Sequence, residues 1–259
     1  MKNRGYIFDY GGTLDTGGCH WGRMFWHAYR ELDVPVSETQ FREAYVYAER
    51  TLGRTPVICP DFTFRRTLEV KVELQLRVLA STDLIGPIGP IGPISPISPI
   101  SPIGPIGPIA PIVDYLYAAV LRHTAHSREV LRQLDGPKVL VSNFYGNMPT
   151  VLREFGLDDL FDAVVESAVV GIRKPDPRIF LLGVEALALQ PGEVTVVGDS
   201  LEKDIVPAHA AGCRTVWLKG EQWAAGSSGT DVAADAGNAD MSLADSIIAD
   251  LSELIDCPS

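Results

Sequence analysis

Cysteine is scarce in this chain, and so are long hydrophobic runs. The 259 residues include four cysteines, none of them in a Cys-x-x-Cys spacing, which predicts reduced and mostly structural thiols. No segment reaches the length needed to span a membrane. The apolar run that follows Lys2 and Arg4 is too short for a signal peptide. We therefore expect a cytoplasmic protein with no membrane partner.

Positive charge is also in deficit. The chain carries 22 Lys and Arg against 33 Asp and Glu, a formal net charge of −11, which argues against nucleic acid as a partner. An acidic surface also repels anionic substrates, so a phosphate site needs local positive charge. Lys174, its neighbour Arg173 and a bound cation are the candidates for that charge.

Polar side chains stand directly after three short apolar stretches that are typical of buried strands. In an open α/β sheet, ligands bind beyond the carboxyl ends of the strands. A lysine also lies in a loop before two prolines, and a further acid follows the third strand. In chain order, these elements are strand 6–8 with Asp9, strand 138–141 with Ser142 and Asn143, the loop lysine Lys174, and strand 194–197 with Asp199 and Asp204.

This order of a strand-end Asp, a strand-end Ser, a loop Lys and an acidic pair resembles the four motifs of the haloacid dehalogenase (HAD) superfamily. The stretches 173–180 and 197–205 stand nearly as that family writes them. The resemblance covers 1–16 and about 136–255. It implies a magnesium-dependent phosphatase that acts on a small phosphorylated metabolite through an aspartyl-phosphate intermediate.

The resemblance also implies a role for each motif residue. Asp9 would be the nucleophile, assisted by Ser142 and Lys174. Magnesium would take oxygen ligands from Asp9, from the backbone carbonyl of Gly11 and from the two later acids. The residues expected to bind the phosphate are Gly12, Thr13, Ser142, Asn143 and Lys174, and those expected to bind the metal are Asp9, Gly11, Asp199 and Asp204.

One position departs from the family pattern. Phosphatases of this family usually carry a second Asp two residues after the nucleophile, as general acid and base, and this chain has Gly11 there. Loss of such a group typically costs 10²–10⁴-fold in rate. A phosphatase that favours good leaving groups, with His20 or water in the missing role, is one interpretation. A phosphonatase-like C–P hydrolase that uses Lys71, and a catalytically degenerate phosphate-binding or interaction protein, are the alternatives.

Alternation of strands and helices after Lys138 predicts a doubly wound parallel, Rossmann-like α/β sheet. Strand 6–8 must join that sheet to bring Asp9 to Asp199. We therefore assign 1–16 and 136–259 to a catalytic core and 17–135 to an inserted, mostly helical cap. Met241 to Ile255 reads as a closing helix.

Within the expected cap, residues 68–78 fit both a strand and a helix. Alternating apolar residues favour a strand, whereas the intervening Glu, Lys, Gln and Arg favour a helix. We predict a helix, because the resembling family has a helical cap here. Side chains of this cap that face the site would set specificity, and the candidates are His20, Arg23, His27 and Arg54.

Residues 86–112 repeat the triplet x-Pro-Ile, with Gly, Ser or Ala at x. Proline at every third position argues against a helix and favours polyproline II. The repeat is either an expanded low-complexity insertion in a surface loop or an apolar edge that binds a protein partner or a second copy.

Overall fold

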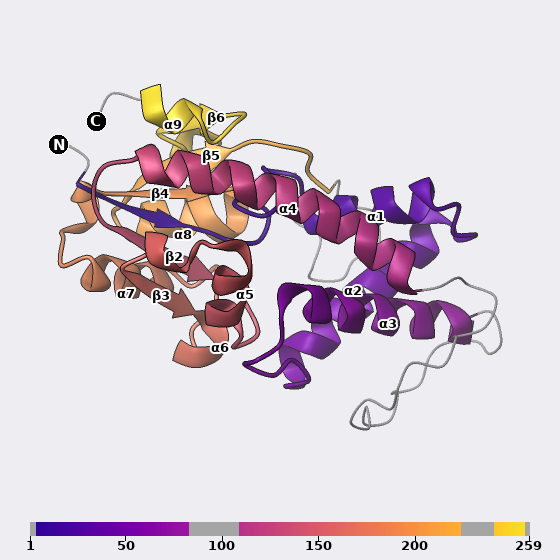
Figure 1. Cartoon of the computed structure of the whole chain (residues 1–259). Coiled ribbons are helices and arrows are strands. Elements are labelled where there is room, and N and C mark those ends of the chain that lie inside the picture. Colours follow the sequence, from indigo (N-terminus) through magenta and orange to yellow (C-terminus); the bar gives the residue numbers. More distant parts are fainter. Residues whose placement is uncertain (1–3, 83–108, 224–240, 257–259) are drawn as a thin grey trace.

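The computed structural model describes residues 4–82, 109–223 and 241–256 (Figure 1). Its centre is a six-stranded parallel sheet with the strand order β3-β2-β1-β4-β5-β6. This confirms the doubly wound α/β fold. The strands are β1 (Gly5–Phe8), β2 (Lys138–Ser142), β3 (Ala163–Glu166), β4 (Val194–Gly198), β5 (Arg214–Leu218) and β6 (Ser246–Ile248).

The direction of strand addition reverses at β1. The chain adds β2 and β3 on one side of β1 and then β4, β5 and β6 on the other. Such a switch point leaves a crevice at the carboxyl ends of the central strands. Asp9, Ser142 and Asp199 each lie at the end of one of these strands, so the topology brings three distant motifs to one place.

Both faces of the sheet are buried, which explains the unbroken apolar strands. Ile7 and Val139 point into a core on the face covered by α7 and α8, whereas Phe8 and Leu140 join a core on the opposite face, with α4 and α5. The helices of this part, short 3₁₀ turns and one π turn included, are α5 (Met148–Phe155), η1 (Asp158–Leu160), α6 (Ser167–Val170), α7 (Arg178–Ala186), η2 (Pro191–Glu193), η3 (Leu201–Ile205), α8 (Val206–Ala210), η4 (Met241–Leu243) and α9 (Glu253–Asp256).

The secondary-structure elements described between β1 and β2 are all helices, joined by turns and loops. Its helices are α1 (Trp21–Glu31), α2 (Glu38–Arg54), α3 (Phe64–Thr82) and α4 (Ile109–Gln133). Ser37 and Gln40 form a capping box that starts α2, as their spacing predicts. Figure 1 shows α1, α2 and α3 beside the sheet, with α4 running along both parts.

The ambiguous stretch 68–78 belongs to α3, so the helix prediction is confirmed. Leu68, Val72 and Leu76 pack into the main core, while Val70 and Leu74 pack against α2 in a separate cluster. Because α3 is buried on two faces, it needs apolar residues on both of them. Its apolar residues therefore alternate with polar ones as they would in a strand, although the segment is a helix.

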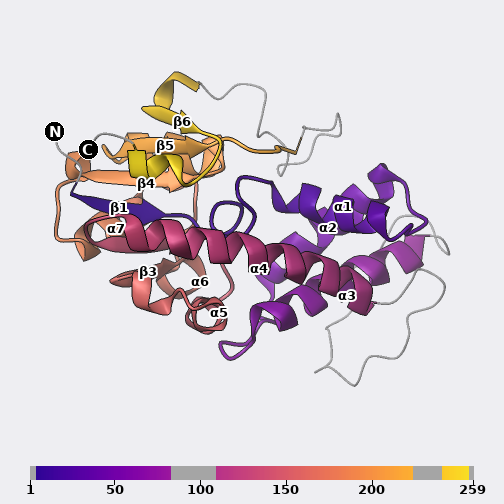
Figure 2. The same cartoon turned by 45° about the horizontal axis from the view of Figure 1, so that its top comes forward.

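Helix α4 connects the inserted helices to the sheet (Figure 2). Near its carboxyl end, Val130 and Leu131 belong to the same core as Phe8 of β1. The Ser127 hydroxyl donates a hydrogen bond to the Leu14 carbonyl at 2.8 Å. The helical insertion is therefore packed onto the sheet through a continuous core.

The x-Pro-Ile repeat falls largely outside the described residues, and the expected polyproline II conformation of 86–108 lies there. Its last residues, 109–112, form the first turn of α4, so the argument that proline keeps the repeat out of helices is wrong at this end. Pro111 is tolerated because N–H groups in the first turn have no intrahelical partner.

The carboxyl-terminal part of the chain also differs from its prediction. Residues 246–248 form the edge strand β6, paired with β5, where the sequence pattern indicates a helix. The Asp245 carboxylate accepts hydrogen bonds from the Thr215 backbone at 2.8 Å and the Thr215 hydroxyl at 3.2 Å. These long-range bonds anchor the strand, and no local pattern announces them. None of the described helices has the length and apolarity that crossing a membrane requires.

Candidate active site

Two glycines allow the backbone to pack tightly around the strand-end acids. Gly12 has φ +105°, and a Cβ there would lie 2.4 Å from the Asp199 carboxylate. A Cβ at Gly198 would lie 2.4 Å from the Cβ of Asp204. Any larger residue would push the acids apart, so glycine is required at both positions.

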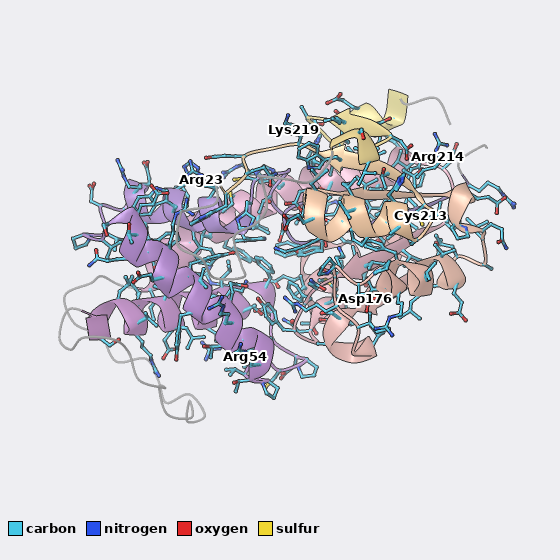
Figure 3. The ribbon with its side chains drawn as sticks, turned by 180° about the vertical axis from the view of Figure 1, so that it is seen from behind. Arg23, Arg54, Asp176, Cys213, Arg214 and Lys219 are labelled. Atoms are coloured by element: carbon cyan, nitrogen blue, oxygen red, sulfur yellow. The ribbon has the colours of Figure 1, made fainter. Side chains whose placement is uncertain are left out.

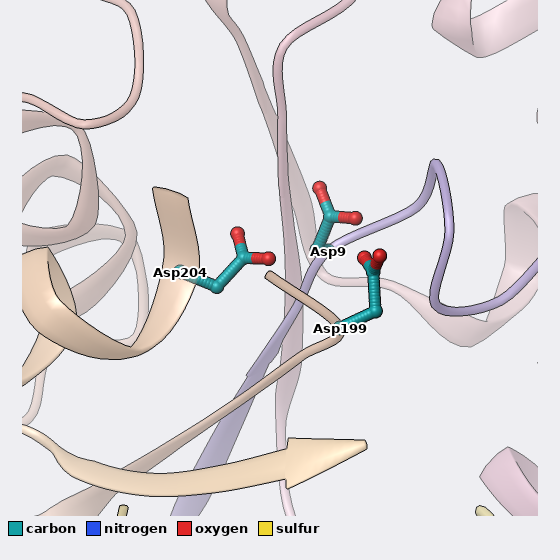
Figure 4. Close-up of side chains that lie close together, drawn as sticks. All are labelled: Asp9, Asp199 and Asp204. Carbon is teal, nitrogen blue, oxygen red and sulfur yellow. The ribbon is translucent and has the colours of Figure 1, made fainter. Parts of the chain in front are cut away.

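Asp9, Asp199, Asp204 and Lys174 converge at the carboxyl end of the sheet. The Lys174 Nζ lies 2.6 Å from Asp9 Oδ1 and 2.7 Å from Asp204 Oδ1. The three acids each present a carboxylate oxygen, and these oxygens all lie within 4.8 Å of one another. Figure 4 shows the three carboxylates turned toward a common space. All four side chains are buried.

The electrostatics of this cluster are unbalanced, since three carboxylates face one ammonium group. Burial raises the pKa of Asp9 to about 6, although Lys174 acts in the opposite direction. Burial, together with the neighbouring Asp204 and Asp9 carboxylates, raises the pKa of Asp199 well above its usual range. The arrangement therefore attracts additional positive charge.

In the turn after β1, Gly12 and Thr13 make hydrogen bonds to acidic residues. The Thr13 hydroxyl accepts a hydrogen bond from the Asp199 backbone N–H at 3.0 Å and lies 3.1 Å from Asp199 Oδ1. The Gly12 N–H donates to Asp15 Oδ1 at 2.7 Å. Neither Gly12 nor Thr13 lines the pocket. The described hydrogen bonds of these two residues lie within the protein, and their direct binding of phosphate stays a prediction.

Ser142 and Asn143, at the end of β2, both line the pocket. The Asn143 side chain accepts a hydrogen bond from the Lys174 backbone N–H at 2.9 Å and donates one to the Lys174 carbonyl at 3.1 Å. This reciprocal pair holds the lysine loop against β2. Asn143 thus positions Lys174 in addition to facing the pocket.

The acids lie in a pocket whose empty space is about 920 Å³, open solvent at its mouth included. This is within the size range of sites for small molecules. The inserted helices supply much of its wall through Tyr45 and Glu49 of α2 and Phe64, Thr67, Leu68 and Lys71 of α3. Sequence reasoning missed Glu49 as a site residue, because one acid on an amphipathic helix carries no distinguishing signal.

Of the four residues expected to set specificity, only His20 lines the pocket, and the other three lie elsewhere. His20 lines the pocket and caps α1, accepting a hydrogen bond from Gly22 N–H at its Nδ1, 3.0 Å away. Arg23 and His27 lie one helical turn apart and both bind Glu221, at 2.6 and 2.8 Å. Arg54 is exposed at the end of α2, and Figure 3 shows it at the opposite edge of the helical segment from Arg23.

Gly11 lines the pocket beside the indole of Trp21. A Cβ at Gly11 would lie 3.8 Å from Trp21 Nε1, an ordinary contact distance. The indole N–H donates to Asp15 Oδ2 at 2.9 Å, and Asp15 is fully buried. Burial raises the pKa of Asp15 to about 8. Space for a small side chain at Gly11 is therefore present next to a fixed aromatic ring.

Comparison with curated proteins finds short but clear matches. The chain is 43% identical over 63 residues to a glyceraldehyde 3-phosphate phosphatase of Pyrococcus furiosus, covering 24% of this chain and 26% of that protein. It is 44% identical over 63 residues to a phosphoserine phosphatase of Thermus thermophilus, covering 24% and 25%. The chain thus matches only about a quarter of the length of these relatives.

Solved structures match nearly the whole chain, but at low sequence identity. These matches therefore show a similar fold and nothing more. YfnB from Bacillus subtilis, described as a HAD-hydrolase bound to magnesium, has a TM-score of 0.53 at 16% identity, covering 99% of this chain and 98% of that one. A dehalogenase has a TM-score of 0.56 at 17% identity, covering 97% and 95%. The sequence profile of the haloacid dehalogenase-like hydrolases matches residues 4–212. With these motifs gathered at the switch point of the sheet, the chain belongs to the haloacid dehalogenase-like hydrolase family.

Proposed function

We propose that this protein is a magnesium-dependent phosphatase of a small phosphorylated metabolite. The observation that carries the proposal is a cluster of three buried carboxylates that line one pocket, with Lys174 bridging two of them, Asp9 and Asp204. The phosphatase names of its partial relatives support the same class of substrate.

The donor set fits magnesium. Asp9, Asp199 and Asp204 offer hard oxygen ligands, and Lys174 leaves their negative charge only partly neutralised. A bound dication would balance that charge and neutralise the oxygens of a phosphoryl group. We assign Asp9, the Gly11 carbonyl and the two later acids as its ligands.

Asp9 is the proposed nucleophile. One of its carboxylate oxygens attacks phosphorus while the bond from phosphorus to the leaving-group oxygen breaks, forming an aspartyl-phosphate. Water then hydrolyses this acyl phosphate and regenerates the carboxylate. Lys174, 2.6 Å from Asp9, offsets the repulsion between carboxylate and phosphate. Ser142 is assigned as a hydrogen-bond donor to the phosphoryl group.

Residues 17–135 are assigned as a cap over the core. Support comes from the pocket lining, to which α2 and α3 contribute side chains beside those of the strand ends. A pocket lined in this way has room for a small metabolite. The cap is therefore the part of the chain that recognises the leaving group.

The alternatives fit less well. A phosphonatase-like reaction needs a neutral amine, but the Lys71 Nζ lies 2.9 Å from Glu49 Oε1. Burial lowers the pKa of Lys71, yet Glu49 outweighs it and the net shift is upward. A degenerate binding module has no need for every acid of the cluster. His20 accepts a hydrogen bond at Nδ1, so in its neutral form Nε2 carries the proton and is a donor, not a base.

Hydrolysis of acetyl phosphate and para-nitrophenyl phosphate tests the proposal, with and without magnesium. We expect metal-dependent turnover that is abolished in Asp9→Asn and retained in Asp176→Asn, which changes a partly exposed acid in the lysine loop. A second readout is thermal unfolding, in which magnesium at a hundredfold excess over Kd stabilises by about 2.7 kcal/mol. Asp199→Asn should weaken that shift. Turnover that persists in Asp9→Asn would contradict the mechanism.

A further inference from the structure

A partly buried ion pair in the wall of the pocket has no role in the chemistry described above. Lys71 of α3 and Glu49 of α2 are 2.9 Å apart, with their side chains 11% and 26% exposed. The Tyr145 hydroxyl, from the loop after β2, donates to Glu49 Oε2 at 3.0 Å. Three separate elements thus converge on one polar cluster, which we call the Glu49–Lys71–Tyr145 cluster.

Stability alone does not account for this cluster. Removing two charges from water costs free energy that a buried ion pair only partly recovers, and apolar residues of similar volume are often as stable. All three members line the same pocket as Asp9. A polar cluster that is costly to bury and faces a binding pocket is better explained by a ligand than by folding.

The charges of the cluster indicate which ligand it fits. Glu49 and Lys71 neutralise each other, and both stay charged at neutral pH, since burial is outweighed in each case by the partner. A ligand carboxylate would have to approach Glu49, and a ligand ammonium would have to approach Lys71. Hydroxyl groups can donate to the carboxylate and accept from the ammonium without breaking the pair.

Aromatic rings complete the wall around this cluster. The Lys71 Nζ lies 5.1 Å from the centroid of the Tyr145 ring and 5.9 Å from that of Trp21. Trp21 is held by its hydrogen bond to Asp15, and its ring packs 5.7 Å from that of Phe64. Fixed rings offer apolar surface to carbon-bound hydrogens while the cluster supplies oriented polar groups.

Two exposed cations also line the pocket. Arg173 and Lys203 both line it and are adjacent in sequence to Lys174 and Asp204. Both attract the phosphate dianion of a substrate, and Arg173 also acts on Glu49, whose pKa it helps to lower. Discrimination among leaving groups is assigned to the Glu49–Lys71–Tyr145 cluster.

We propose that the Glu49–Lys71–Tyr145 cluster binds the leaving group, and that this group is an uncharged, polyhydroxylated one such as a sugar. The inference rests on the proposed phosphatase function and specifies its substrate class. Sugar phosphates should bind better than phosphate esters that carry a carboxylate or an amine.

The test separates binding from leaving-group reactivity. Acetyl phosphate, whose leaving group is too small to span the pocket, serves as the substrate. Glucose 6-phosphate, O-phosphoserine and 3-phosphoglycerate serve as competitors, and their inhibition constants are compared. We expect glucose 6-phosphate to give the lowest constant, and Glu49→Gln to raise it by about 10- to 100-fold, as loss of hydrogen bonds to a charged group predicts.

A matched control lies on α3 itself. Glu73 is also buried and ion-paired, with Arg77, but it does not line the pocket, so Glu73→Gln should leave all inhibition constants unchanged. Tyr145→Phe removes only one hydroxyl, so it tests the cluster even if the Glu49 variant does not fold. It should weaken the binding of glucose 6-phosphate alone. Hydrolysis of acetyl phosphate should stay the same in Glu73→Gln.

Three results would each overturn one of the two proposals. Wild-type protein without metal-dependent hydrolysis of acetyl phosphate would overturn the proposed function itself. Active protein that binds O-phosphoserine or 3-phosphoglycerate more tightly than glucose 6-phosphate would overturn this inference alone. The same holds if Glu49→Gln and Tyr145→Phe leave the constant for glucose 6-phosphate unchanged.

Discussion

Gly11→Asp should add the proton donor that this site lacks. A Cβ at Gly11 meets Trp21 Nε1 at 3.8 Å and Cδ1 at 3.9 Å, so the backbone and its neighbours accept a side chain there. Gly12 gives the opposite case, because a Cβ at that position would lie 2.4 Å from Asp199. An acid at residue 11, two residues after the proposed nucleophile, would face the pocket.

The expected gain depends on the leaving group. General acid catalysis typically contributes 10²–10⁴-fold, and it matters most when the departing oxygen is strongly basic. For Gly11→Asp we therefore expect turnover of an alkyl ester such as glycerol 3-phosphate to rise by up to about that factor. Acetyl phosphate, whose leaving group departs without a proton, should gain little.

The assay is steady-state release of phosphate from glycerol 3-phosphate, para-nitrophenyl phosphate and acetyl phosphate at saturating magnesium. Gly11→Asn is the control, because it has the same shape and no transferable proton. The gain in Gly11→Asp should grow from acetyl phosphate to glycerol 3-phosphate, and Gly11→Asn should show none. Equal behaviour of the two variants, or no gain on glycerol 3-phosphate, would refute the view that Gly11 marks a missing acid.

Two further predictions concern stability. Burial lowers the pKa of His20 to about 4, so below about pH 6.5 the unfolded chain binds a proton at His20 that the folded protein does not bind. Between pH 7 and pH 4, the free energy of unfolding of the wild type, measured in urea, should therefore fall by up to about 3 kcal/mol more than that of His20→Asn. Asparagine keeps a cap acceptor for Gly22, and parallel pH profiles of the two proteins would contradict this assignment. Leu76 of α3 lies in the main core, so Leu76→Ala should lower the free energy of unfolding by about 2–5 kcal/mol. Leu121 of α4 is 45% exposed, so Leu121→Ala should change the free energy of unfolding by no more than about 0.5 kcal/mol. A small effect at Leu76 would be inconsistent with the two-sided burial of α3.

The sheet and its acids could be predicted because both depend on local pattern. Short apolar runs indicate buried strands, and parallel strands end at a common edge, so Asp9, Ser142 and Asp199 had to meet once β1 joined the sheet. The strand β6 escaped prediction because it depends on distant bonds between Asp245 and Thr215. A local pattern carries no information about such a partner.

The site shows the same division between sequence and tertiary structure. By itself, the sequence determined which residues stand at strand ends, and hence the acids, the lysine and the absence of an acid at Gly11. Only the tertiary structure decided that Thr13 supports Asp199, that Arg23 and His27 bind Glu221, and that Glu49 and Lys71 face the pocket. The reason is physical: strand ends are ordered by the sheet, whereas the direction of a helical side chain depends on how helices far apart in the chain pack.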